Sequence, residues 1–99
     1  MILKIIRGEQ FKEELKAVVS FIAKDKRTAA KKFNHALQIA IDSLIDNPHK
    51  GRSNEDGNRE LIYKGYTIPY LVYGESIVIL GIFNQNEWIP KDDQGASKQ

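Results

Sequence analysis

The sequence predicts an α+β domain in which a helical hairpin packs on one face of a small, mostly antiparallel sheet, in the order β-α-α-β-β-β. Residues 59–83 contain three short apolar and aromatic runs, separated by two turns that each include a glycine. Two longer stretches before them carry apolar residues at helical spacing. A three-stranded meander is too small to be stable alone, so we expect the two helices to cover it.

The first predicted element is a strand over Ile2–Ile6, and a helix follows after Gly8. The helix is indicated by one apolar stripe, and its polar outer face is formed by lysines, glutamates and a serine. We expect this helix to end near Lys24–Lys26, where the apolar periodicity stops. The residues of the stripe are Phe11, Leu15, Val18 and Ile22.

A second helix is predicted from a second, wider stripe. Thr28 is the expected N-cap, because its hydroxyl can accept a hydrogen bond from an unpaired backbone N–H. Asn47-Pro48 is the expected end, because proline disfavours helical geometry at the residue before it. A polar loop rich in turn-forming residues, Pro48–Asn58, then leads to the sheet. The stripe consists of Ala30, Phe33, Leu37, Ile41 and Leu44.

The three strands of the meander differ in character. In the middle strand, Tyr66, Ile68, Tyr70 and Val72 fall on one face, and we expect Tyr66 and Tyr70 to be core residues. Pro69 lies inside this strand and lacks a backbone N–H, which predicts a bulge or break at Ile68–Pro69, or an edge position. The last strand, 77–83, is apolar at nearly every position and should be covered on both faces.

Composition limits the class of protein. The 99 residues form one predicted domain over 1–90, followed by a polar tail over 91–99 that we expect to be disordered. Cysteine is absent, which excludes disulfides and thiol chemistry, and two histidines offer no metal-ligand spacing. No apolar run approaches the roughly 20 residues of a membrane helix, so we expect a cytoplasmic protein without a membrane partner. We expect no cofactor and no metal.

The charge distribution leaves two interpretations open. Net charge is only +2, but five of the nine residues from Lys24 to Lys32 are basic, against a single acid, Asp25. Such a run is either a solvated helix end or a patch that faces nucleic acid or an acidic protein segment.

Four stretches, in this order, resemble motifs of the RelE/ParE superfamily of bacterial toxins. The likeness extends from about residue 11 to residue 83. The stretches are Ala30–Phe33 with Leu44, Pro48, Gly51 and Arg52 (A-x-x-F…L…P-x-x-G-R), Arg59–Leu61 (R-x-L), Tyr66–Val72 (Y-x-I-x-Y-x-V) and the apolar strand Ile77–Ile82.

This resemblance implies the toxin of a type II toxin–antitoxin module, with a cognate antitoxin as partner and operator DNA bound only through the antitoxin complex. RelE-like members cut mRNA on the ribosome, whereas ParE-like members inhibit DNA gyrase without catalysis. The shared fold does not choose between the two targets.

For RNA cleavage, the candidate catalytic residues are Arg59, Arg52, Lys64 and His49. The 2′-hydroxyl must lose a proton, and cations must stabilise the phosphate in the transition state. Arg59 matches the family motif and can hold a phosphate bidentately, but it can equally be a partner for Glu60 or Glu55. His49 could act as a base or be a solvated loop residue, and His35 is the weaker candidate.

One departure from the family pattern favours the ParE side. Many ribosome-dependent members place a His, Arg or Tyr after the closing strand, but residues 84–88 here contain none of these. The long helical hairpin also resembles the ParE side. The hypotheses are therefore a ParE-like gyrase inhibitor, a RelE-like mRNA endonuclease, and a degenerate member that binds its antitoxin without being toxic.

Overall fold

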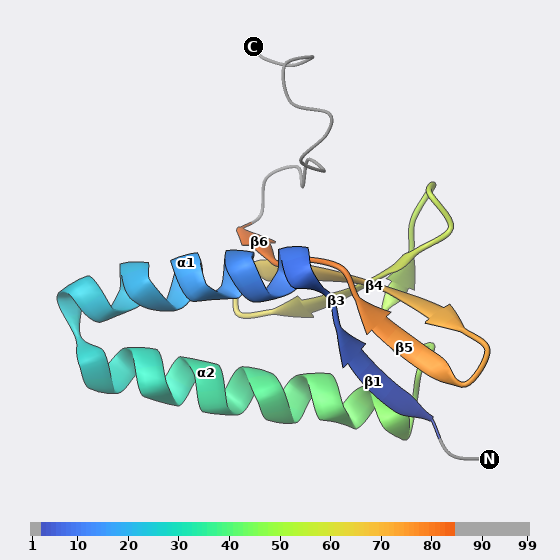
Figure 1. Ribbon diagram of the computed structural model, residues 1–99, viewed down its shortest axis with the longest axis horizontal. Helices are drawn as coiled ribbons and strands as arrows, with labels where there is room; N and C mark the ends of the chain where they lie inside the picture. Colours follow the sequence, from blue (N-terminus) through green and yellow to red (C-terminus); the bar gives the residue numbers. More distant parts are fainter. Residues whose placement is uncertain (1–2, 85–99) are drawn as a thin grey trace, which may run out of the picture.

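Two helices lie side by side over one face of a sheet in the computed structural model, which describes residues 3–84 (Figure 1). The predicted fold class is confirmed. Residues 1–2, the segment after Asn84 and the predicted tail lie outside the described residues. The elements are β1 (Lys4–Arg7), α1 (Glu9–Asp25), α2 (Arg27–Asp42), a 3₁₀ turn (Ser43–Ile45), β2 (Arg52–Ser53), β3 (Arg59–Tyr63), β4 (Tyr66–Tyr73), β5 (Ser76–Ile79) and β6 (Phe83–Asn84).

The sheet has the strand order β1-β5-β4-β3-β2, and β6 pairs separately with β4. Within residues 3–84, only β1 and β5 run parallel, and every other strand pair is antiparallel. Strand β2 lies within the segment that we expected to be entirely loop, Pro48–Asn58. Its two residues are exposed and polar, so they carry no apolar alternation from which a strand could be predicted.

The predicted interruption at Ile68–Pro69 is confirmed. Residues 70–73 of β4 pair with β5, and Tyr70 lies opposite Ile79. Residues 66–67 of β4 pair with β6, and Thr67 lies opposite Phe83. Two residues of β4 therefore face the three residues 80–82, which is the arrangement of a bulge. The carbonyl of Pro69 accepts a hydrogen bond from the Leu80 N–H (2.9 Å). The backbone nitrogen of Pro69 therefore faces the same edge of β4, where the pairing with β5 and β6 is interrupted and no N–H donor is needed.

The prediction of one continuous strand over 77–83 is consequently wrong, because the chain leaves the ladder between Ile79 and Phe83. Helix α1 compensates for part of the lost pairing. The backbone N–H of Ile82 donates to the carboxylate of Glu14 at 3.0 Å. The bulge is thereby tied to the helical layer.

The helical hairpin turns within one residue. Helix α1 ends at Asp25, as predicted, and Lys26 is both its C-cap and the N-cap of α2. The prediction that Thr28 is the N-cap is wrong, since Thr28 already lies in the first turn of α2. Helix α2 ends at Asp42, earlier than expected, because the chain tightens into the 3₁₀ turn and the Ser43 hydroxyl donates to the carbonyl of Ala40 (2.6 Å).

The core lies between the two layers. Its sheet side includes Tyr70, which is completely buried as expected, while Tyr66 is half-buried against Phe33 with ring centroids 5.3 Å apart. The buried cluster consists of Phe11, Leu37, Ile41, Leu44, Leu61, Ile68, Tyr70, Ile77, Ile79 and Ile82. The described helices include none that is long and apolar enough to cross a membrane.

Leu37→Ala is expected to lower the free energy of unfolding by about 2–5 kcal/mol, because Leu37 is fully buried and its loss leaves a cavity. Urea denaturation measures the effect. The matched control is Ile39→Ala on the same helix, where the side chain is 58% exposed and the expected change is within about 0.5 kcal/mol. Equal losses for the two variants would contradict this assignment of the core.

Candidate functional site

The loop after the 3₁₀ turn is fastened to the sheet by the hydroxyl of Tyr70. This hydroxyl accepts a hydrogen bond from the Gly51 N–H (2.9 Å) and donates one to the Pro48 carbonyl (2.7 Å). Gly51 is buried, and a Cβ there would lie 2.5 Å from the Glu60 carbonyl oxygen and 2.9 Å from the Tyr70 ring. The P-x-x-G spacing therefore serves to dock the loop on β3 and β4, and only glycine fits at the contact.

Arg59 holds the same loop from the neighbouring strand. Its Nη1 atom donates to the carbonyl of Gly51 (2.6 Å) and to the carbonyl of His49 (3.2 Å). Arg59 is the Cα partner of Tyr70 across the β3–β4 ladder, so the two side chains share the face that carries the helices. The guanidinium thus binds backbone carbonyls, and the carboxylates of Glu60 and Glu55 are not its partners.

Arg52 lies on the opposite face of the sheet from Arg59. It is the Cα partner of Glu60, and both its Nε and its Nη2 lie 3.0 Å from Oε1 of that carboxylate. Because neighbouring residues of a strand point to opposite faces, Glu60 and Arg52 are turned away from Arg59. The Arg52 side chain is 69% exposed, and such surface ion pairs contribute only about 0–1 kcal/mol.

His49 and Lys64 complete the set of four candidates. His49 is exposed and meets Arg59 through its backbone carbonyl. Lys64 occupies the β3–β4 turn with a positive φ of 47°, and its Nζ lies 5.6 Å from the Tyr63 ring centroid. Lys64 comes five positions after Arg59, and an extended strand rises by about 3.3 Å per residue. The structure therefore brings Arg59 and the His49 backbone together, but not the four side chains.

The structure also places the other residues that the sequence suggested for contact with RNA or for its cleavage. Tyr63 and Tyr66 both pack on Phe33, with ring centroids 5.9 Å and 5.3 Å away, whereas Tyr73 is 74% exposed. His35 is exposed on α2. Asn84 is the exposed last residue of β6, and the rest of the segment 84–88 lies outside the described residues. Among residues 3–84, no group of three or more acidic or histidine side chains could hold a metal ion.

Sequence reasoning missed the two residues that organise this loop, Gly51 and Tyr70, as a pair. Each of the two residues belongs to a motif that is visible in the sequence: the glycine to the P-x-x-G-R stretch and the tyrosine to the Y-x-I-x-Y-x-V stretch. Nineteen positions separate the two residues, and no local pattern connects a buried hydroxyl with a backbone N–H at that distance.

These features define a class: a small α+β domain with a helical hairpin over a mostly antiparallel sheet. A solved structure described as "Chromosomal ParDE TA system from P. aeruginosa" has the same fold, with a TM-score of 0.75 and 21% sequence identity over 86% of this chain and 98% of that chain. The family model for the ParE toxin of the type II toxin–antitoxin system parDE matches residues 5–87. The chain belongs to this family of toxins. A search of the curated protein sequences finds no match.

Tyr70→Phe is expected to lower the free energy of unfolding by about 1–3 kcal/mol, because it leaves the Gly51 N–H and the Pro48 carbonyl without their partner. Thermal or urea denaturation provides the measurement. Tyr73→Phe is the matched control, since this exposed side chain should tolerate the same change at no cost. A Tyr70→Phe protein as stable as its parent would show that the hydroxyl does not fasten the loop.

Proposed function

We propose that this ParE-family toxin inhibits growth by binding DNA gyrase, and that a cognate antitoxin neutralises it. The main support for inhibition by binding is the placement of the two arginines. Arg59, the strongest catalytic candidate, donates to the carbonyls of Gly51 and His49, while Arg52 lies on the other face of the sheet. Inhibition by binding requires no convergent set of acid, base and cation. This function places the chain in the cytoplasm, with operator DNA reached only through the antitoxin complex.

A metal-independent ribonuclease needs more than single cations. A base must lie within hydrogen-bond reach of the 2′-hydroxyl while a cation contacts the same phosphate. Lys64, at the far end of β3, and Arg52, paired with Glu60, are badly placed to act together with Arg59 on one phosphate. The arrangement of the four candidates therefore supports binding over cutting.

The alternative is a RelE-like, ribosome-dependent mRNA endonuclease, and one observation favours it. Arg59 uses only Nη1 for the loop carbonyls, so Nε and Nη2 make no hydrogen bond within the described chain. Those two nitrogens could still hold a phosphate in the bidentate manner typical of arginine. The His49 side chain, exposed in the same loop, would then be the candidate base.

Two assays separate these functions: DNA supercoiling by gyrase in the presence of the purified toxin, and primer extension on translated mRNA after the toxin is induced. Gyrase inhibition predicts that the purified toxin blocks DNA supercoiling by gyrase, that antitoxin added in equal amount restores supercoiling, and that primer extension on translated mRNA finds no new ends. Codon-linked cuts with normal supercoiling would overturn the proposal in favour of the endonuclease. Unchanged growth and unchanged supercoiling would overturn both and identify a degenerate, non-toxic member.

A further inference from the structure

Helix α1 carries an apolar hollow on the side that faces the end of the sheet. The hollow has a volume of about 290 Å³ and is lined by Ala17, Val18, Phe21, Tyr66 and Asn84. Tyr66 and Asn84 are Cα partners in the pairing of β4 with β6, and Asn84 is the last residue of β6. The hollow therefore lies at the junction between the helical layer and the strand from which the rest of the chain continues.

A second hollow adjoins the first at Phe21, which lines both. It has a volume of about 590 Å³ and lies at the closed end of the hairpin, where its lining is Phe21, Ile22, Lys24, Asp25, Lys26 and Ala29. Figure 1 shows that this end of the hairpin extends past the strands. The consequence is visible in two phenylalanines of α1: Phe11 is buried, whereas 69% of Phe21 is exposed. Within residues 3–84, the apolar side chain of Phe21 thus lacks the cover that the sheet gives to Phe11.

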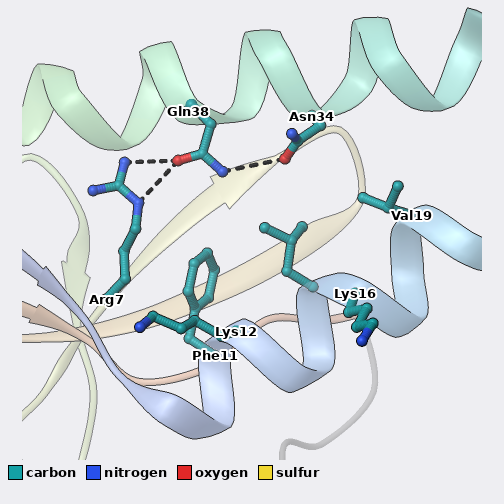
Figure 2. Close-up of a pocket in the computed structure, with 8 residues that line it drawn as sticks. Arg7, Phe11, Lys12, Lys16, Val19, Asn34 and Gln38 are labelled. Atoms are coloured by element: carbon teal, nitrogen blue, oxygen red, sulfur yellow. Dashed lines mark hydrogen bonds between the residues drawn. The ribbon is translucent and has the colours of Figure 1, made fainter.

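The hollows between α1 and α2 have a different character. Five basic side chains line them, and the polar side chains there are already hydrogen-bonded. Arg7 donates to Gln38 Oε1 through Nε (2.9 Å) and Nη2 (2.7 Å), and Gln38 donates to Asn34 (3.2 Å) (Figure 2). An apolar occupant therefore fits better at Phe21 than between the helices. The five basic residues are Arg7, Lys12, Lys16, Arg27 and Lys31.

We propose that residues 85–90 of the chain itself fill the hollow at Phe21, with Trp88 and Ile89 packed against Phe21 and Tyr66. Asn84 lines this hollow, and Trp88 follows it by only four positions. Four residues span at most about 14 Å, which is ample for a hollow beside one helical turn. The turn from Ala17 to Phe21 rises by only about 6 Å. Trp88 can therefore reach every part of the hollow.

The chemistry of this segment favours it over a separate molecule. Trp88 and Ile89 are the two large apolar side chains that follow Asn84. Because the segment is joined to the rim of the hollow by a short connection, its effective concentration there is roughly millimolar. Its single charged residue is Glu87, and two of the residues that line the adjoining hollow are Lys24 and Lys26. Such docking gives a physical reason for the predicted domain boundary at residue 90.

The first test uses Trp88, the only tryptophan of the chain. In the folded protein its fluorescence should peak at a shorter wavelength than in urea, and acrylamide should quench it several-fold more slowly. Phe21→Ser should move both values toward those of the unfolded chain, because it removes the main apolar contact. The variant should keep the helical circular dichroism of the parent, since Phe21 is exposed on the described domain. Ile39→Ser is the matched control: this side chain is 58% exposed and lines neither hollow, so the fluorescence should not change.

The second test uses the absence of cysteine from the chain. Ala17→Cys places one thiol in the hollow, and Ser20→Cys places one at an exposed position of α1 outside it. Adding Trp88→Ala should speed the maleimide labelling of Ala17→Cys several-fold, because the indole no longer covers the thiol. The labelling of Ser20→Cys should be the same with and without Trp88. Equal labelling of Ala17→Cys in the two backgrounds would overturn the proposal.

Three outcomes of the fluorescence test would also overturn it. The first is a folded protein whose Trp88 emits and is quenched as in urea. The second is exposure of Trp88 by Ile62→Ser and not by Phe21→Ser, which would place the segment on the sheet face opposite the helices. The third is quenching that depends on protein concentration, which would show docking in a second copy. Neither antitoxin nor gyrase enters these measurements, so the proposed function is tested separately.

Discussion

The buried hydroxyl of Tyr70 connects the helical half of the chain to the sheet half. Through the Pro48 carbonyl and the Gly51 N–H it fixes where the chain leaves the helical layer and where β2 meets β3. Arg59 then binds the carbonyls that the same loop turns toward it. The position of the loop, and with it of His49 and Arg52, therefore depends on one phenol in the middle strand.

Because Tyr70 and Arg59 hold this loop in place, the family motifs that contain them have a structural role. For the RelE-like alternative, the likeness predicts that Arg59 and Arg52 contact phosphate, but in the structure both side chains already bind groups of the chain itself. Arg59 satisfies backbone carbonyls, and Arg52 pairs with Glu60, whose second oxygen accepts from Asn54 (3.2 Å). A motif that docks this loop is compatible with either target, because the fold alone does not determine function.

Much of the fold could be predicted from the sequence, since it follows from local periodicity and from proline. The hairpin, the end of α1, the break at Pro69 and the burial of Tyr70 are such cases. The single-residue turn at Lys26 could not be predicted, because backbone bonds rather than a side-chain cap form it. The gathering of basic side chains around the hollows between α1 and α2 could not be predicted either. These side chains come from β1, α1 and α2, and only Arg27 and Lys31 among them belong to the basic run seen in the sequence.

We propose that Arg59 acts through the loop and not on a substrate. The most direct test is growth inhibition per folded molecule for Arg59→Ala, with the folded fraction measured by circular dichroism in the same preparation. If Arg59 only fastens the loop, Arg59→Ala lowers the free energy of unfolding by about 1–3 kcal/mol and the folded variant still inhibits growth. A folded Arg59→Ala protein whose inhibition falls by about a hundredfold or more would show that Arg59 acts on a substrate, because that loss is typical of a removed catalytic group.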